Sequence, residues 1–279
     1  MIAYRQIASL LRWLVVLGFS LLLAAPVVAV ELKPETVAAF DKYVRLSEQR
    51  MTSELASGPF LYIDALAPAE REAEYAGLRQ GKILIRHLHT EEQGKSIEVP
   101  GGLIHHWVGV VFVPGATLRQ TLDFLQDYDH QARFFSPDVQ KSKLRSRDGN
   151  RFKVYLRLKK TKVVTVFLDT DYDVEYLPID ATRQVSSSRS TRIAEIANAG
   201  QPNERAKPVG DGAGFMWRLN SYWRFWQKDG GVYVQLEAIS LTRDIPAGLG
   251  WLIRPFVTSI PKESIEFTLD HTGAALKPR

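Results

Sequence analysis

The chain has 279 residues and a mass of 31.5 kDa, a length that suits one large domain or two small ones. Its 45% hydrophobic and 24% charged residues exclude a largely disordered chain, and the absence of cysteine excludes disulfide bonds, a thiol nucleophile and cysteine-bound metal. The formal net charge of +5 is far below that of a histone-like protein.

The first 29 residues have the pattern of an export signal. Arg5 and Arg12 provide a positive start, and an apolar run over 13–29 ends in small residues. We expect cleavage after Ala29 and a periplasmic or secreted protein. An uncleaved anchor is the alternative, because the run is nearly long enough to span a bilayer. Loss of the two arginines would lower the net charge from +5 to +3, so nucleic acid is not an expected partner.

Residues 30–81 are expected to form a helical arm. Apolar residues recur at helical spacing over 34–57 and 68–80, which predicts two helices. The apolar piece between them, 60–63, is expected to be extended. One alternative for the function is a structural envelope protein that contacts a partner through this arm.

From Lys82 onward the apolar residues alternate, which is typical of strands. Thr117 is expected to cap a helix that begins at Leu118, and the spacing over 261–276 predicts an amphipathic C-terminal helix. Strands are expected near 83–89, 103–113, 141–147, 151–159, 163–176, 183–197, 214–227 and 232–243.

A tight hairpin is predicted at Lys228-Asp229-Gly230-Gly231, because Asp-Gly is a preferred two-residue turn. This register pairs Phe225 with Val234 and puts the apolar residues of both strands on one face, which must be buried. That face carries Trp217, Leu219, Ser221, Trp223, Phe225, Val234, Leu236 and Ala238. The opposite face carries Arg218, Asn220, Tyr222, Arg224, Gln235, Glu237 and Arg243.

Two charged runs alternate on neighbouring strands, so each set shares one face of its strand. A turn near 162–163 would place the two sets opposite each other, which predicts cross-strand ion pairs on a solvated face. The alternative is a patch for anionic lipid head groups. The basic set includes Arg151, Lys153 and Arg157, and the acidic set is Asp169, Asp171, Asp173 and Glu175.

The order of elements resembles the START-like superfamily, also called the helix-grip or SRPBCC fold. The resemblance lies in residues 108–139, 151–176, 230–246 and 259–276 and extends over about 82–279. It implies an α+β fold, in which a bent antiparallel sheet wraps around a long C-terminal helix with an apolar cavity between them. Members of this superfamily mostly bind lipids, sterols, polyketides or other hydrophobic ligands, and a minority are cyclases or hydrolases.

We expect an exported START-like monomer that binds a hydrophobic small molecule or lipid without catalysis. The apolar hairpin face would then be a cavity wall, whereas the residues alone fit a filled core equally well. Arg189 on a serine-rich strand could point inward and anchor an anionic group. The candidate ligand-binding residues are Trp217, Ser221, Trp223, Phe225, Leu236, Tyr172, Arg189 and Trp251.

Catalytic and metal-binding motifs are weak in this sequence. His87, His89, His105 and His106 could meet on neighbouring strands, but no acidic residue with matching spacing completes a zinc site, apart from Glu91 or Glu92 just beyond the strand. We therefore expect no metal and no cofactor. The enzyme alternative of the same fold would use a polar pair such as Arg224 and Glu237, which lie on one face of the hairpin and otherwise predict a salt bridge.

An apolar segment connects the last expected strand to the last expected helix. Over 244–257 it contains two prolines, two glycines and too many apolar groups for a bare solvent loop. One interpretation is that it packs over the C-terminal helix. The other is a lid that contacts the membrane transiently through 248–257, with Trp251 at the interface and Arg254 near a phosphate.

Overall fold

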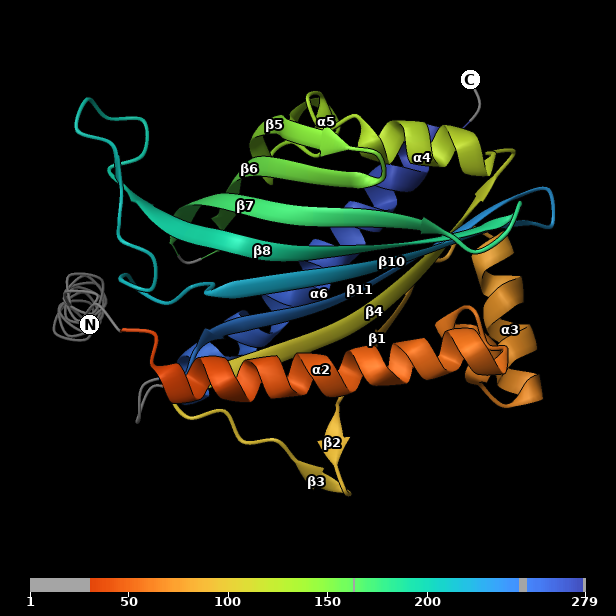
Figure 1. Ribbon diagram of the computed structural model, residues 1–279, viewed down its shortest axis with the longest axis horizontal. Helices are drawn as coiled ribbons and strands as arrows, with labels where there is room; N and C mark the ends of the chain where they lie inside the picture. Colours follow the sequence, from red (N-terminus) through yellow and green to blue (C-terminus); the bar gives the residue numbers. More distant parts are fainter. Residues whose placement is uncertain (1–30, 163, 246–249, 278–279) are drawn as a thin grey trace, which may run out of the picture.

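The computed structural model describes residues 31–162, 164–245 and 250–277, and the side chains of Ser57 and of residues 250–258 lie outside the described part. Within these residues, nine strands form one antiparallel sheet that curves around the C-terminal helix α6 (Gly250–Leu276) (Figure 1). The predicted α+β fold, a bent antiparallel sheet with a long C-terminal helix, is confirmed.

The strands follow from alternating apolar residues, and their spatial order places the last strand of the body next to one from its beginning. From one edge to the other the sheet contains β1 (Leu84–His87), β4 (Gly102–Pro114), β11 (Gly231–Arg243), β10 (Arg218–Lys228), β8 (Arg183–Ala197), β7 (Thr165–Pro178), β6 (Arg151–Thr161) and β5 (Val139–Asp148). The short strand β9 (Arg205–Ala206) pairs with β8, and β2 (Glu91–Glu92) and β3 (Lys95–Ser96) form a separate hairpin.

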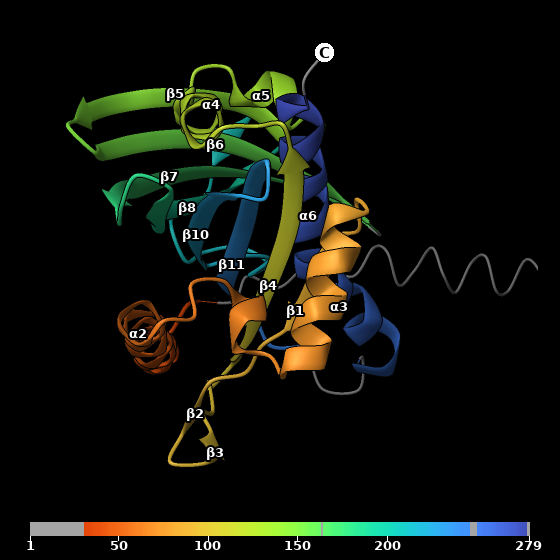
Figure 2. The ribbon, with the colours of Figure 1, turned by 90° about the vertical axis from the view of Figure 1, so that its right-hand side faces the viewer.

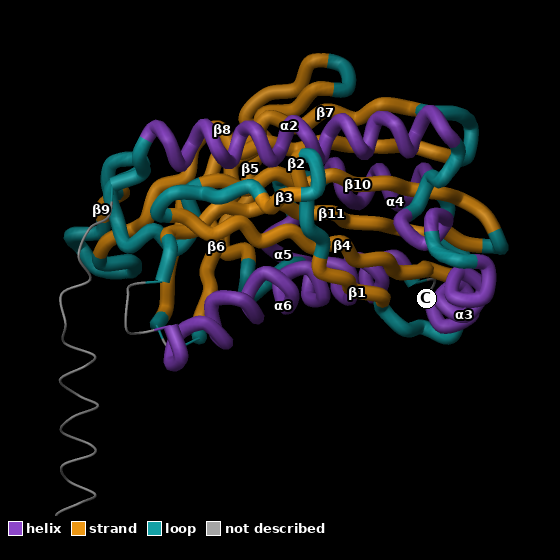
Figure 3. The backbone as a smooth tube through the Cα atoms, turned by 90° about the horizontal axis from the view of Figure 1, so that it is seen from below, coloured by secondary structure: helices purple, strands orange, loops and turns teal. Residues whose placement is uncertain are grey.

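Helices cover both faces of the sheet. Figures 2 and 3 show α6 on the face that we call inner and α2 (Pro34–Ser57) on the outer face. The remaining helices are the 3₁₀ helix η1 (Tyr62–Ala65), α3 (Pro68–Arg79), α4 (Leu118–Gln126) and α5 (Gln131–Phe134). Thr117 caps α4 as predicted, with its hydroxyl accepting from the backbone N–H of Gln120.

Two predicted boundaries are wrong. The piece at 60–63, expected to be extended, enters the 3₁₀ helix η1 at Tyr62. The C-terminal helix begins at Gly250 rather than near Pro261, so it includes the second half of the segment that we considered as a lid. Proline removes one backbone hydrogen bond from a helix interior, but a helix that is supported by packing continues through that loss.

The hairpin and the charged face agree with the sequence. In the β10–β11 turn Asp229 and Gly230 have φ values of 56° and 73°, and Phe225 pairs with Val234 as predicted. The ion pairs on the β6–β7 face are Arg151 with Glu175 at 2.9 Å, Lys153 with Asp173 at 2.9 Å and Arg157 with Asp169 at 2.7 Å. These pairs confirm the predicted cross-strand register.

A glycine fixes the position of α6. A Cβ atom on Gly109 of β4 would lie 2.5 Å from Leu269 Cδ1 and 2.7 Å from Ile265 Cγ2, so only glycine lets the helix approach the strand this closely. Ile265 and Leu269 are buried in the main apolar cluster between α6 and the inner face. The helix is therefore held against one part of the sheet.

The outer face is buried as well, beneath the arm. Phe40, Tyr43, Val44 and Met51 of α2 pack in a second cluster against β10 and β11. A third cluster joins η1 and α3 to β1, β4 and β11. The outer face of the β10–β11 hairpin is thus covered, although the sequence alone required burial of only the apolar face.

Candidate functional site

Part of the inner face is apolar but only partly buried. The register places these residues on the same face as the buried cluster, yet their side chains remain accessible, unlike the fully buried Phe225 beside them. We call this surface the inner wall. It consists of Leu156 on β6, Ser188 and Ser190 on β8, Leu219, Ser221 and Trp223 on β10, and Ala238 on β11.

The position of α6 accounts for the accessible wall. The helix packs mainly against β4, with smaller contacts to β11 and β1. Figure 2 shows β5 to β8 curving away from this contact. The inner wall lies largely on these diverging strands and on β10. There the described part of α6 is farther from the sheet than it is at Gly109 of β4.

One end of the inner face is closed by aromatic residues. Phe152, Tyr176 and Phe225 are buried there with Tyr128, which follows α4. The Tyr128 and Tyr176 hydroxyls lie 3.0 Å apart and share a hydrogen bond. Burial raises the pKa of Tyr176 to about 12, although the hydrogen bond to Tyr128 acts against it. Both tyrosines therefore stay protonated at neutral pH.

The Ser186 hydroxyl, next to this tyrosine pair, is buried without a hydrogen-bond partner that meets ordinary geometric limits. The register aligns Ser186 with Tyr176 on one side and Trp223 on the other, so its side chain is on the inner face. A buried hydroxyl without a partner costs free energy, and a ligand oxygen is one group that could satisfy it.

Two further titratable side chains of the inner face are neutral at neutral pH. Burial, helped by the nearby His87, lowers the pKa of His105 to about 4. Burial raises the pKa of Tyr172 to about 12. At these positions the inner face therefore presents a hydroxyl group and neutral rings.

The predicted ligand-binding residues fall into four groups, the last of which lies on the outer face. Ser221 and Trp223 belong to the inner wall, and Trp223 stacks on Phe225 with ring centroids 6.0 Å apart. Phe225, Leu236 and Tyr172 are buried in the cluster behind that wall. Trp251 lies outside the side chains that the structure describes.

Two of the predicted residues lie on the outer face instead. Trp217 precedes the first paired residue of β10, so strand alternation does not apply, and its indole joins the cluster under α2. Arg189 pairs with Asn220 in register, not with the inner Ser221, and its guanidinium is 2.6 Å from Glu48 of α2. The prediction that Arg189 points inward is therefore wrong.

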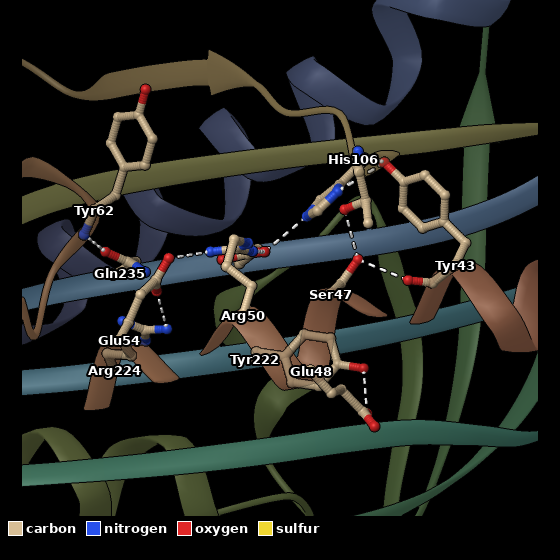
Figure 4. A network of polar contacts seen from close by, with 12 residues as sticks. Tyr43, Ser47, Glu48, Arg50, Glu54, Tyr62, His106, Tyr222, Arg224 and Gln235 are labelled. Carbon is tan, nitrogen blue, oxygen red and sulfur yellow. Dashed lines mark hydrogen bonds and ion pairs between the residues drawn. The ribbon is translucent and has the colours of Figure 1, made fainter. Parts of the chain in front are cut away.

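A network of buried charges joins α2 to the outer face (Figure 4). Glu237 of β11 accepts from His106 at 2.7 Å and forms an ion pair with Arg50 of α2. Burial acts to raise the pKa of Glu237, but the hydrogen bond from His106 and the charge of Arg50 lower it to a net value below the ordinary one. Arg224 of β10 donates to Glu54 Oε2 at 2.7 Å.

The expected salt bridge between Arg224 and Glu237 is thus replaced by two contacts with α2. Both side chains are almost fully buried, with 4% and 2% of their surface exposed. Arg50 and Glu54 were missed because the helix was recognised from its apolar spacing alone. Their signal was a pair of opposite charges at i and i+4 on a helix that faces a strand carrying Arg224 and Glu237.

The four clustered histidines do not converge. His105 contacts Thr242, His106 contacts Tyr43 and Glu237, and His89 contacts Ser96, while the His87 ring stacks edge-on against Trp107. Among the described residues, no group of three or more histidine, aspartate or glutamate side chains is placed to hold a metal ion. No helix in the described ranges has the length and apolar content needed to cross a membrane.

Comparison with known proteins gives similarity in fold. No protein-family model and no curated protein matches the sequence. A STAR-related lipid transfer protein from Xanthomonas axonopodis is 16% identical, with 67% of this chain and 98% of that chain covered and a TM-score of 0.42.

Two further solved structures show a similar likeness. The Zhui aromatase/cyclase from Streptomyces is 14% identical, with 62% and 94% of the two chains covered and a TM-score of 0.43. Human STARD10 is 9% identical, with 75% and 80% covered and a TM-score of 0.41. These structures include both lipid-transfer and cyclase proteins, and at such identities the likeness assigns no ligand or activity to this chain.

Proposed function

We propose that this protein binds a hydrophobic, lipid-like small molecule against the inner wall and does not catalyse a reaction. The observation that carries the proposal is the partial exposure of Leu156, Leu219 and Trp223 on the face that points toward α6. Filled protein interiors are close-packed, and large apolar side chains in them are buried as Phe225 is. Accessible apolar groups on a concave face are typical of a ligand site.

Binding fits the described side chains better than catalysis does. The inner wall offers hydroxyl and apolar groups, without a nucleophile that has a base beside it among the described residues. The polar pair considered for acid–base chemistry, Arg224 and Glu237, is buried beneath α2 and fully engaged with it. No substrate on the inner wall reaches that pair.

The cell envelope is the proposed place of action. This part of the proposal depends on the pattern of residues 1–29, which lie outside the described residues. Intact-mass measurement of protein from envelope fractions should give a mature chain that begins at Val30. A chain that still carries Met1 would instead indicate a membrane-anchored protein.

The decisive experiment is the analysis of what the purified mature protein carries. Mass spectrometry of organic extracts should find one hydrophobic molecule in near-stoichiometric amount. Protein that is empty, and that fails to take up the neutral apolar dye Nile red, would contradict the proposal. Empty protein that converts an added substrate would support the enzyme alternative.

Membrane contact through 248–257 is a further part of the proposal. From Gly250 this segment is helical, and the side chains of 250–258 are not described. Changing Trp251 and Leu252 to Ser should slow exchange of bound lipid with vesicles while the melting temperature stays near that of the wild type. Unchanged exchange would leave this segment as an ordinary part of α6.

A further inference from the structure

Charged and neutral side chains are sorted onto opposite faces of the sheet. On β6 and β7 the ionised residues alternate with apolar ones and form cross-strand pairs on the outer face. On β8, β10 and β11 the outer positions carry Arg189, Arg224 and Glu237, each paired with a residue of α2 or β4. At inner positions over 186–190 of β8 and 219–225 of β10, hydroxyl and apolar side chains take their place.

These hydroxyls form a continuous row across the inner face. Ser186 and Ser188 of β8 lie on the same face as Ser221 of β10, and the register aligns Ser188 directly with Ser221. On the other side of β8, Tyr176 aligns with Ser186. The row runs from the accessible wall to the closed end.

The hydroxyl groups at the closed end can form more hydrogen bonds than they form with one another. When Tyr128 and Tyr176 share one hydrogen bond, one of the two hydroxyls keeps a proton that the bond does not use. The adjacent Ser186 hydroxyl is 4% exposed and interacts with the Tyr176 hydroxyl, but it forms no bond within ordinary geometric limits. Because nearly all buried polar atoms have a good partner, this cluster can accept one further oxygen atom, from a ligand or from water.

Two of the three cations at the margins of this face have anionic partners. Lys160 lies 2.6 Å from Asp138, and Lys162 lies 2.7 Å from Glu263 of α6. Arg147 is exposed on the edge strand β5, where its guanidinium lies over the Phe152 ring and donates to Gly149. Arg147 forms no ion pair with a described carboxylate, but it is exposed, so a carboxylate or phosphate held deep against the inner wall would lose water without meeting a buried unpaired cation among the described side chains.

We infer, on the basis of the proposed function, that the ligand is electrically neutral and that an oxygen atom of it binds the hydroxyl cluster of Ser186, Tyr176 and Tyr128. Suitable chemical classes are long-chain or polycyclic alcohols, ketones and esters. Fatty acids and phospholipids are excluded as the preferred ligands.

Three matched probes test the charge of the ligand. Dodecan-1-ol, methyl dodecanoate and dodecanoate share one chain length and differ in the terminal group. Displacement of Nile red from the mature protein at pH 8, where dodecanoate is ionised, gives the three affinities. The two neutral probes should bind at least tenfold more tightly than dodecanoate.

The outcomes separate this inference from the proposed function. If dodecanoate binds as tightly as the neutral probes, the inference is overturned and the proposed function stands. If the Arg254→Gln variant then loses dodecanoate binding, Arg254 is the cation responsible. Failure of Nile red and of all three probes to bind would overturn the proposed function itself.

Ser186→Ala tests the oxygen contact. The affinity for dodecan-1-ol should fall about fivefold, while Nile red binding is unchanged. The melting temperature should stay the same or rise, because the change removes a hydroxyl without a good hydrogen-bond partner. The control is Ser47→Ala on α2, where the hydroxyl donates to Tyr43 and contacts Thr90. That change should lower the melting temperature and leave dodecan-1-ol binding alone. A Ser186→Ala protein with reduced stability and unchanged affinity would overturn the oxygen contact.

Discussion

The buried guanidinium of Arg224 on β10 donates to the Glu54 carboxylate on α2 at 2.7 Å, and to the backbone oxygen of Phe60 at 2.8 Å. One side chain thus holds both the long helix of the arm and the turn that follows it. Because Arg224 is only 4% exposed, solvent screens this ion pair much less than it screens an ion pair on the surface.

Replacing Arg224 with Met should therefore lower the free energy of unfolding by about 3–5 kcal/mol, the range for removal of one partner of a buried pair. Urea unfolding measures the change. The matched control is Arg189→Met, whose pair with Glu48 is largely exposed and should contribute about 0–1 kcal/mol. Equal losses in the two variants would show that α2 is not held by the buried network.

A methyl group on Gly109 should displace α6. Gly109→Ala would force contacts of 2.5 and 2.7 Å with Leu269 and Ile265, at a cost of about 1–3 kcal/mol for overpacking. Gly273→Ala in α6 is the control, because its new Cβ would lie 3.7 Å from Val111 Cγ2 and alanine favours a helix by up to about 1 kcal/mol. Thermal unfolding should move the two variants in opposite directions.

Trp223 and Phe225 should respond differently to replacement by Leu. Trp223 is accessible, so Trp223→Leu should weaken ligand binding about tenfold. This factor corresponds to the loss of ~50 Å² of apolar contact with the ligand, at ~25 cal/mol per Å². Phe225 is fully buried, so Phe225→Leu should cost more stability. Melting curves and titration of the bound ligand measure both quantities. A large melting loss with unchanged affinity for Trp223→Leu would make this residue part of the packed core.

His105 should make the protein less stable in mild acid. Its pKa is about 4 in the folded protein because of burial, against an ordinary 6.5, so the unfolded chain binds a proton first as the pH falls. Stability should then decline between pH 6.5 and about 4, by on the order of 3 kcal/mol. Urea unfolding at several pH values should show a shallower decline in His105→Gln, which keeps a group able to contact Thr242. The exposed His130→Gln should follow the wild type.

The sequence predicts local pairing well in this protein, because the patterns that specify it are short. The Asp229-Gly230 turn fixes the register of β10 and β11, and the alternating charges of β6 and β7 face each other once the turn between them is placed. In both cases, the position of the turn and the alternation of side chains along each strand determine all the cross-strand residue pairs. The serine-rich β8 was likewise placed with its correct ends.

The contacts of the arm were not predictable in the same way. Apolar spacing identifies α2 as amphipathic, but it does not say which surface the helix covers or that Arg50 and Glu54 meet Glu237 and Arg224. For Trp217, strand alternation does not apply, because the pairing of β10 begins at Arg218 whereas we expected the strand from residue 214. The predicted start of α6 is late because proline commonly marks a helix boundary, whereas this helix continues through its prolines.

The position of α2 also bears on the order in which the protein acquires its structure. Arg50 and its partner Glu237 are 187 residues apart, and Glu54 and Arg224 are 170 apart. The arm leaves the ribosome first, yet the strands it covers are made last, so its charged residues stay in water until synthesis is nearly complete. Closure of such distant contacts is slow. Late closure suits a polypeptide that must cross a membrane before it folds, as the proposed export signal requires.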